Sequence, residues 1–472
     1  MSDDTRTHTH THYRDAIRDA VADGARLVSL YATADADAAC VRTVICRPNG
    51  LLETFSVAVA DGAVPSLVDI DPTAEWPERE AHDLHAVRFD GHEPLRPLVD
   101  HPAELASWTV PVSGDDVYQI AVGPIHAGVI ESGHFRLHVV GDRILHLDLR
   151  LFFKHRGLER AAAGHPLDDA IAYAQRACGA CAVTNSVAYA HAAEQLRGLR
   201  PAADIARART LLLELERLWS HLNDVAAICS GVGLAAGNQR FAALCEDARR
   251  LNQQIAGHRF LFDSVDVGRS RLYLNEHDLE RARDTISNLR RESTVAWHEL
   301  AFNASVQDRL VGVGVLDHDD ALTLGAVGPV ARSAGIPVDA RTDQAGRLAY
   351  DGFVPAMIDR PTGDVRARFA QRDVELRQTL DLLDDLLESP IFPGYCVPGS
   401  ARVEHAVARI ESPRGATICA LEAGRATLTR MHLRTGSYAN WPVLVRVVPG
   451  NLMPDFPLIN KSFELCYACA DR

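Results

Sequence analysis

The sequence predicts an α+β protein, in which a small N-terminal α/β domain is followed by a large helix-rich domain with small sheets near both of its ends. The length of 472 residues exceeds that of one typical domain. Short β-type runs and one helical segment alternate before residue 98, whereas long segments with apolar residues at helical spacing dominate the remainder. We therefore expect two domains, at residues 13–112 and 118–472.

The N-terminal domain is predicted from one helix and two strands. The helical segment runs from Tyr13 to Gly24, and β-type runs follow at Arg42–Cys46 and Thr54–Val59. Prolines interrupt the segment Leu95–Pro102, which favours the beginning of a linker. We place the end of this domain near residue 112.

The large domain is predicted to begin with strands and to continue as helices. Gly133–Gly141 alternates apolar and polar residues, which is typical of a half-buried strand. Apolar residues recur at helical spacing in Leu211–Cys229, Arg240–Phe262 and Arg366–Leu387. We expect these helices to form most of the large domain.

Composition and charge exclude some classes of function. Hydrophobic residues make up 47% of the chain and charged residues 24%, as in ordinary globular proteins. The formal net charge of -14 argues against a nucleic-acid partner, because binding to phosphates requires clustered Lys and Arg. No stretch approaches the ~20 apolar residues of a membrane span, and the N-terminus lacks the pattern of a signal peptide. We expect a soluble, cytoplasmic chain whose partner is a protein or a neutral small substrate.

Two C-x-x-C pairs stand out among the ten cysteines, namely Cys178-Gly-Ala-Cys181 and Cys466-Tyr-Ala-Cys469. Cytosolic thiols stay reduced, so close pairs indicate metal or redox chemistry. Residues three apart on a helix can direct both sulfurs at one ion, and soft sulfur suits zinc, an iron-sulfur cluster, or nickel bridged to iron. From the residues alone, three interpretations stay open: one shared metal site, two unrelated buried pairs, or a redox disulfide.

The sequence around both pairs resembles the large subunits of nickel-iron hydrogenases. Arg176-Ala-Cys-Gly-Ala-Cys181 resembles the R-x-C-G-x-C motif of that family, whose other C-x-x-C lies near the C-terminus, as the second pair does here. Gly123–Arg136 is similar to a segment of the energy-converting branch. His155-Arg-Gly-Leu-Glu159 and Glu411-Ser-Pro-Arg-Gly415 resemble the family's R-G-x-E and E-x-P-R-G motifs. The large domain is thus similar to hydrogenase large subunits and to the homologous quinone-proximal subunit of complex I.

The N-terminal part carries a second resemblance. Trp76–His92 is similar to the signature of the small peripheral-arm subunit of complex I that adjoins the quinone-proximal subunit. Fusion of these two partners is the arrangement of large subunits of the formate hydrogenlyase and hydrogenase-4 type. The resemblance, which extends from about residue 13 to 472, implies the catalytic large subunit of a membrane-associated nickel-iron hydrogenase that forms or splits hydrogen reversibly.

The resemblance implies a set of metal ligands. Cys178 and Cys466 would bind nickel terminally, and Cys181 and Cys469 would bridge nickel and iron. Glu159 matches a glutamate that helps to hold a buried magnesium ion. The implied cofactors are therefore a nickel-iron centre and, at a separate position, magnesium.

Three further residues take roles from the resemblance. Arg414 would project its guanidinium over the open metal position, and Glu131 would begin the proton path. His126 matches the histidine that binds the quinone head group in complex I. Each of these residues could instead have no functional role, as a surface residue, a salt-bridge partner or a packed side chain.

The implied partners are subunits of a membrane complex. No further cysteine set could hold an iron-sulfur cluster, so we expect such clusters only in a partner small subunit. Antiporter-like and anchor subunits in the membrane, a formate dehydrogenase and a quinone complete the implied set. We expect the chain to lie peripherally on the cytoplasmic face of the inner membrane.

Two departures from the hydrogenase pattern favour a second interpretation. Asn185 stands where a histidine commonly lies four residues after the first pair, and Glu464-Leu465 replaces an Asp-Pro. We expect the second change to remove an acidic group close to the metals. The alternatives are a nickel-free, complex I-like NADH-quinone oxidoreductase subunit, and a structural subunit with zinc or no metal at the thiols.

Overall fold

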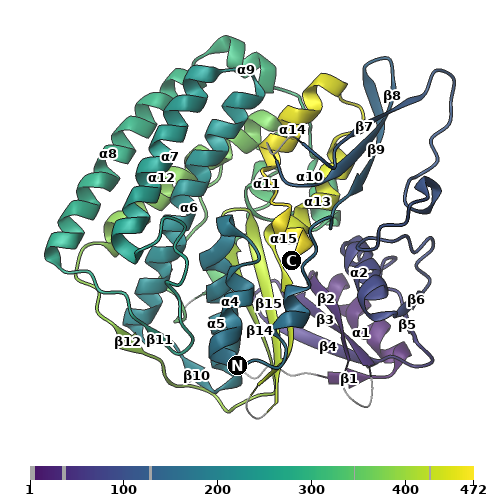
Figure 1. Ribbon diagram of the computed structural model, residues 1–472, viewed down its shortest axis with the longest axis horizontal. Helices are drawn as coiled ribbons and strands as arrows, with labels where there is room; N and C mark the ends of the chain where they lie inside the picture. The colour runs from purple at the N-terminus through teal and green to yellow at the C-terminus, as the bar shows by residue number, and fades with distance from the viewer. Residues whose placement is uncertain (1–5, 35–38, 127–129, 345, 425–426) are drawn as a thin grey trace.

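The computed structural model of the chain describes residues 6–34, 39–126, 130–344, 346–424 and 427–472. Figure 1 shows the N-terminal elements, drawn in purple, on the opposite side of the molecule from the long helices of the large domain. The last helices of the chain, drawn in yellow, lie between these two parts. The end of the chain is therefore placed where it can contact both domains.

The N-terminal domain is built on a four-stranded sheet with the strand order β1-β4-β3-β2. Strands β2, β3 and β4 pair antiparallel, whereas β1 runs parallel to β4. Helix α1 buries Tyr13 and Ile17, which lie four residues apart on one face. The bounds are β1 (Arg6–His8), α1 (His10–Ala22), β2 (Arg26–Ala34), β3 (Ala39–Cys46), β4 (Leu52–Ala58), β5 (Ala63–Pro65), α2 (Glu75–His85) and β6 (Arg88–Asp90).

The long helices of the large domain pack against each other around apolar faces. Helix α7 ends at Ala256, before the predicted end at Phe262, because Gly257 adopts the left-handed conformation that ends helices. Helix α8, which the sequence pattern did not single out, begins with a capping box between Asn275 and Asp278. The bounds are α6 (Ala203–Gly231), α7 (Ala235–Ala256), α8 (Glu276–Ala301), α9 (Ala304–Leu310), α10 (His318–Thr323), α11 (Gly328–Ser333) and α12 (Val365–Leu386).

Two three-stranded antiparallel sheets lie near the two ends of the large domain. One has the order β7-β8-β9 and the other β14-β15-β16. With the helices between them, they confirm the predicted α+β class. The bounds are β7 (Tyr118–Val122), β8 (His134–Val140), β9 (Arg143–Arg150), β14 (His405–Ser412), β15 (Gly415–Ala423) and β16 (Leu428–Arg434).

Shorter elements connect these layers and carry the residues of the candidate site. They are α3 (Leu158–Ala162), α4 (Leu167–Gln175), α5 (Ala182–Leu196), α13 (Gly436–Val447), α14 (Phe456–Phe463) and α15 (Ala468–Asp471), together with the two-residue pairs β10 (Leu199–Arg200) with β13 (Val397–Pro398) and β11 (Arg269–Ser270) with β12 (Gly394–Tyr395). Helix α5 packs on β14 and β15, which joins the helical layer to the second sheet.

The two domains meet through an apolar contact between their sheets. Tyr31 and Val44 of the N-terminal sheet pack against Val407 and Ile418 of the large domain. At the edge of this contact, the Arg42 guanidinium donates to Glu422 at 2.6 Å. The N-terminal domain is thus fixed against β14 and β15.

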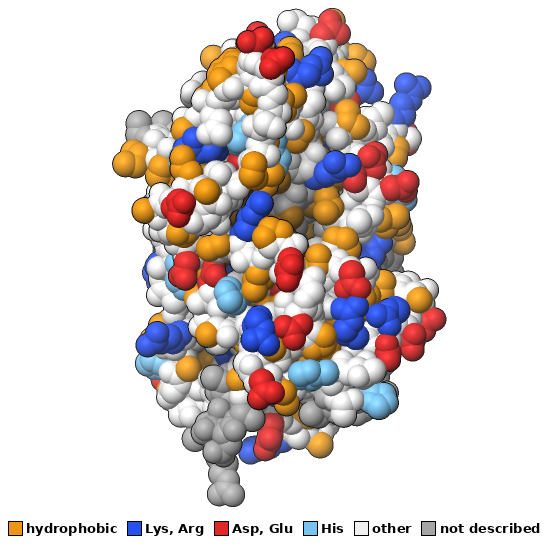
Figure 2. Space-filling view, turned by 90° about the vertical axis from the view of Figure 1, so that its right-hand side faces the viewer, with side chains coloured by type: hydrophobic (Ala, Val, Ile, Leu, Met, Phe, Trp, Pro, Cys, Tyr) orange, Lys and Arg blue, Asp and Glu red, His pale blue; other side chains and the backbone are white. Residues whose placement is uncertain are grey.

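The outer surface mixes charges of both signs. Figure 2 shows acidic and basic side chains interspersed with hydrophobic ones over the face that it presents. Within the described part of the chain, none of the helices is both long and apolar enough to span a bilayer.

Candidate metal centre

The structure brings the four cysteines of the two pairs together. The Sγ atoms of Cys178, Cys181 and Cys469 all lie within 4.8 Å of one another. The Sγ atom of Cys466 lies 3.0 Å from that of Cys178, which exceeds the ~2.05 Å of a disulfide bond. All four are free thiols. The pairs are therefore not two unrelated features, although they are separated by most of the large domain in sequence.

The ends of short helical segments position these thiols. Cys178 precedes the 3-10 turn Gly179–Cys181, and its Sγ accepts a hydrogen bond from the backbone N–H of Ala180 at 3.3 Å. Cys181 lies immediately before α5, where the positive end of the helix dipole favours a thiolate. Cys469 lies in α15 and Cys466 just before it. The starts of α5 and α15 thus place the four sulfur atoms close to one another.

The thiols differ in acidity. Hydrogen bonds from Cys178 and Cys469 lower the pKa of Cys181 to about 6, against the effect of burial. The hydrogen bond to Cys178 raises the pKa of Cys466 to about 12. Because the thiolate is the form that binds metals, binding of a cation to this cluster would displace protons from its thiols.

Arg414 lies beside the thiols, in the turn between β14 and β15. Its guanidinium donates to Ser220 Oγ at 2.6 Å, to Asp224 Oδ1 at 2.8 Å and to the backbone oxygen of Glu464 at 2.9 Å. Burial opposes its charge, but Asp224 and then Cys181 hold the pKa of Arg414 above its ordinary value. A permanent positive charge thus lies within reach of the thiols, anchored by Asp224.

Helix α6 supplies partners that the sequence pattern did not assign. Glu216, Ser220 and Asp224 are buried and four residues apart, so they share one face of the helix. Glu216 accepts hydrogen bonds from the backbone N–H groups of Val183 and Thr184, at 2.7 and 3.1 Å, at the start of α5. Burial raises the pKa of Glu216 to about 7. The sequence signal that could have identified these three residues was their recurrence at four-residue spacing in an otherwise apolar helix.

Glu131 contacts the second cysteine pair. Its Oε2 accepts a hydrogen bond from the backbone N–H of Ala468 at 2.9 Å and lies 4.0 Å from the Sγ of Cys466. Burial, and then the neighbouring Cys466, raise the pKa of Glu131 above its ordinary value. The geometry gives this carboxyl group the means to exchange a proton with Cys466.

His126 shares the connection between β7 and β8 with Glu131, but it faces its own loop. A ring nitrogen of His126 lies 2.7 Å from the backbone oxygen of Gly133. Residues 127–129 of the motif Gly123–Arg136 lie outside the described residues. The contact fixes His126 in the loop and leaves its match to the quinone-binding histidine as a prediction.

The two departures from the hydrogenase pattern have different outcomes. Asn185 lies one helical turn after Cys181, is fully buried, and neither amide atom has a hydrogen-bond partner among the described residues. Such an amide requires a ligand or water, because buried polar groups are normally paired. Glu464 keeps a carboxyl group near Arg414, and the expected loss of an acidic group at this position stays a prediction. Burial, and then Asp224, raise the pKa of Glu464 to about 8.

The contacts of Glu159 do not fit a magnesium ion. Its Oε1 accepts hydrogen bonds from the backbone N–H of Leu433 and from Arg472, both at 2.9 Å. Its Oε2 accepts one from Arg430 at 3.0 Å and lies 3.4 Å from a ring nitrogen of His432. A divalent cation ~4 Å from one guanidinium would be repelled by ~8 kcal/mol at an effective dielectric constant of about 20. The carboxylate is already satisfied by cationic side chains.

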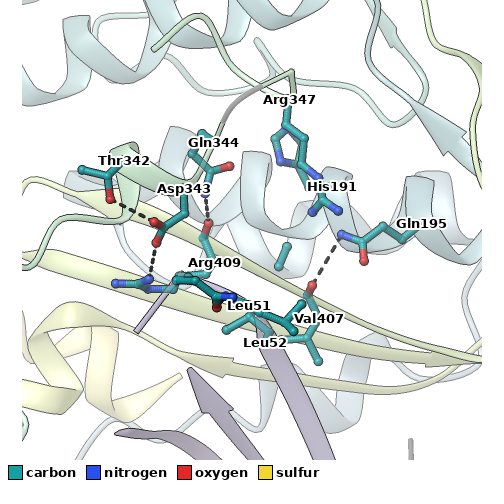
Figure 3. Close-up of a pocket in the computed structure, with 13 residues that line it drawn as sticks. Leu51, Leu52, His191, Gln195, Thr342, Asp343, Gln344, Arg347, Val407 and Arg409 are labelled. Carbon is teal, nitrogen blue, oxygen red and sulfur yellow. Dashed lines mark hydrogen bonds and ion pairs between the residues drawn. The ribbon is translucent and has the colours of Figure 1, made fainter. Parts of the chain in front are cut away.

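A cavity of about 420 Å³ lies away from the thiols, at the domain interface. Figure 3 shows His191 of α5 above Leu51 and Leu52 of the N-terminal domain, with Arg409 paired to Asp343 at 2.7 Å. Burial lowers the pKa of His191 to about 3, so its ring is neutral. The four cysteines are not among the described residues that line the cavity. It belongs to the domain interface and not to the thiol cluster.

Two family models match the chain. The model described as respiratory-chain NADH dehydrogenase, 49 Kd subunit, matches residues 241–394 and 394–472. The model of the 30 Kd subunit of the same enzyme matches residues 19–113. The two matches have the order that the sequence resemblance predicted.

Curated relatives come from hydrogenases and from respiratory enzymes. Formate hydrogenlyase subunit 5 of Escherichia coli (strain K12) is 30% identical over 440 residues, which cover 86% of this chain and 77% of that protein. Hydrogenase-4 component G of the same organism is 30% identical over 403 residues, or 84% of this chain and 69% of that protein. An NADH-quinone oxidoreductase component of Salinispora arenicola is 28% identical, covering 74% of this chain and 93% of its own length.

A solved structure shares the fold of most of the chain. One chain of the membrane-bound sulfane sulfur reductase, an archaeal respiratory membrane complex, superimposes with a TM-score of 0.69 at 26% identity. The match covers 77% of this chain and all of that chain. The chain therefore belongs to the family of oxidoreductase subunits that includes formate hydrogenlyase subunit 5 and hydrogenase-4 component G, in which domains homologous to two subunits of respiratory NADH dehydrogenase are fused.

Proposed function

We propose that this chain is the catalytic large subunit of a membrane-associated nickel-iron hydrogenase, which forms and splits hydrogen reversibly. The observation that carries the proposal is the convergence of the thiols of Cys178, Cys181, Cys466 and Cys469 on one buried point. Four thiolates form the soft donor set that nickel and iron prefer. Hydrogenase relatives at 30% identity support this choice over zinc.

The surroundings of the thiols also fit such a group. Cys178 and Cys466 would hold nickel, and Cys181 and Cys469 would hold nickel and iron together. When bound, the centre supplies the Lewis acid that allows hydrogen to be split into two protons and two electrons. The unpaired amide of Asn185, one turn from Cys181, offers a hydrogen-bond donor to the bound group.

The chain's own residues handle charge and protons. Glu131 lies 4.0 Å from the Sγ of Cys466 and, with its raised pKa, can accept a proton from this thiol and release it toward the surface. Arg414, anchored by Ser220 and Asp224, holds a fixed positive charge beside the thiols. Such a preorganised charge stabilises negative charge that develops during the reaction.

Electrons must leave through another subunit. Among the described residues, no cysteine outside the two pairs belongs to a group of three possible metal ligands. We therefore place the iron-sulfur clusters in a small partner subunit. Antiporter-like and anchor subunits would hold the pair on the cytoplasmic face of the inner membrane, with a formate dehydrogenase as the electron donor.

A second candidate is a nickel-free subunit that transfers electrons in a complex I-like enzyme. It is favoured by the fold shared with a sulfane sulfur reductase and by the NADH-quinone oxidoreductase relatives, because one fold can support different chemistry. In this candidate, His126 would face a quinone.

Hydrogen-dependent dye reduction separates the two candidates. The complex is purified from its own host, with wild type compared to Cys466→Ser and to Cys245→Ser. Cys245 is also buried, but it is not part of the cluster, and its thiol donates a hydrogen bond to the backbone oxygen of Trp219 at 3.4 Å. We expect loss of activity, by at least ~100-fold, only in Cys466→Ser, because a metal ligand is removed. Wild-type protein without hydrogen-dependent activity but with quinone-dependent electron transfer would favour the second candidate.

A further inference from the structure

The buried cluster around Glu159 contains a positive charge supplied by Arg472. The side chain of Arg472 is 3% exposed. One terminal nitrogen donates to Glu159 Oε1 at 2.9 Å and also to the backbone oxygen of Leu433. The other donates to Glu80 Oε2 at 2.6 Å. The Nε atom donates to the backbone oxygen of Ala470 at 3.3 Å, so a single guanidinium bridges two carboxylates and two carbonyl oxygens.

The groups around this guanidinium are those of a hard divalent-cation site. Ligand atoms of Glu80, Glu159 and His432 all lie within 4.8 Å of one another, and all three residues are buried. Carboxylates and carbonyl oxygens are the donors that magnesium and manganese prefer. The charge on the carboxylates is nevertheless balanced, because Arg430 also donates to Glu159, at 3.0 Å.

We propose that the guanidinium of Arg472 replaces a divalent cation in this site. It joins the segment that carries Cys466 and Cys469 to both domains. Glu80 belongs to α2 of the N-terminal domain, and Glu159 to α3 of the large domain. The attachment of this segment is therefore independent of magnesium.

The neighbouring contacts hold the same segment in place. Asp471 accepts hydrogen bonds from the backbone N–H groups of Phe152 and Lys154, at 2.8 and 2.9 Å. The backbone N–H of Arg156 donates to the backbone oxygen of Arg472 at 2.9 Å. A guanidinium has five donors in a fixed plane, so it can satisfy several acceptors at once without coordinated water.

Binding of Mn²⁺, followed by electron paramagnetic resonance, tests the proposal on the full chain in its complex. Mn²⁺ prefers oxygen donors, so it reports on this site and not on the thiols. We expect less than ~0.1 bound ion per chain in wild type but about one in the double variant Arg430→Ala with Arg472→Ala, whose carboxylates lose both cations. Adding Glu159→Gln to this double variant should abolish the binding. Arg42→Ala, which breaks the other interdomain ion pair, serves as the control and should bind none.

One bound Mn²⁺ in wild type, or none in the folded double variant, would overturn the proposal. If the double variant does not fold, wild type decides by itself. Treatment with EDTA should leave its Tm unchanged and release no magnesium. A fall of Tm by ~4 °C, restored by Mg²⁺, would contradict the proposal. None of these readouts depends on nickel or on hydrogenase activity.

Discussion

Among the described residues, two buried clusters have the composition of metal sites, and in one of them a cationic side chain already lies between the possible ligands. The Sγ atoms of Cys178, Cys181 and Cys469 lie within 4.8 Å of one another, and the Sγ atom of Cys466 lies 3.0 Å from that of Cys178. The carboxylates of Glu80 and Glu159 meet around the guanidinium of Arg472. Both groups lie near α15, so the same few residues at the end of the chain complete both clusters.

The difference shows that ligand type alone does not define a metal site. Buried negative charge must be balanced, and either an ion or a cationic side chain can do this. Arg414 lies close to the thiols, yet Asp224 already binds it at 2.8 Å. The thiols therefore share the charge of Arg414 with Asp224, whereas Glu159 is paired with both Arg430 and Arg472.

The largest expected effect is on stability, from Glu159→Gln. This change leaves the guanidinium of Arg472 buried with one carboxylate instead of two, and breaking a buried ion pair costs about 3–5 kcal/mol. We expect a loss of this size in denaturant unfolding at pH 7. Arg290→Ala, which removes exposed pairs to Asp381 and Asp384, should cost less than about 1 kcal/mol. If Glu159→Gln loses no more unfolding free energy than this control, the buried ion pair of Glu159 does not stabilise the fold as this account requires.

The stability that Glu159→Gln loses relative to wild type should become smaller as the pH falls. Three cationic or imidazole neighbours, against the effect of burial, hold the pKa of Glu159 well below its ordinary value of 4.5. A lowered pKa stabilises the fold above pH 4.5, and this contribution is lost as pH falls toward the lowered pKa. The stability difference between wild type and Glu159→Gln should therefore be full at pH 7 and shrink below pH 4.5. A difference that grows on acidification would contradict this assignment.

Arg414→Lys is expected to lower kcat by about 10²–10³-fold, because the charge beside the reacting centre is no longer held in its preorganised position. Lysine keeps the charge but cannot bind Ser220, Asp224 and the backbone of Glu464 together. Nickel content should stay the same. Dye-reduction kinetics with metal analysis would check both, and parallel losses of nickel and activity would instead make Arg414 a structural residue.

Glu131→Gln should slow turnover by about 10²-fold, within the usual range for a group that transfers protons. The amide cannot accept the proton of Cys466, although it preserves the contact with the backbone N–H of Ala468. Exchange between hydrogen and deuterated water would show the effect most directly. Glu131→Asp should retain more activity, and equal rates for both variants and wild type would exclude Glu131 from the proton path.

The smallest expected effect comes from Asn185→Leu. In the metal-free chain this change removes two unpaired buried polar atoms, so stability should stay level or rise by about 1–3 kcal/mol. In the loaded chain it should weaken metal retention ~10-fold, as loss of a supporting hydrogen bond does. Thermal unfolding of the metal-free and the metal-loaded chain measures the difference between these two effects. A loss of stability in the metal-free form would show that Asn185 has a structural partner.

The sequence was sufficient to predict the fold class and the main elements. Periodicity located β3 and β4 of the N-terminal sheet, but not β1 or β2, and it located the cores of α6, α7 and α12. The end of α7 was wrong by several residues, because Gly257 stops the helix although apolar residues continue beyond it. Motif order also predicted which cysteines matter, and the structure brings them together.

The charge pairing of the two clusters could not be predicted from the sequence. Arg472 binds Glu80, which lies 392 residues away along the chain, and no spacing rule connects them. Asp224 is one of several acids in a long helix, and only the fold shows that it binds Arg414. Resemblance predicted magnesium at Glu159 because the glutamate is present, whereas its cationic partners come from β16 and from the residue after α15.

Elemental analysis of the complex purified from its own host tests the central claim most directly. Nickel, iron and magnesium are measured per chain in wild type and in Cys466→Ser. The account predicts about one nickel in wild type, lost in Cys466→Ser, and no magnesium in either. Nickel-free wild type, from a host shown to load nickel into another hydrogenase, would contradict the hydrogenase assignment. Magnesium at one ion per chain would contradict the cationic role of Arg472.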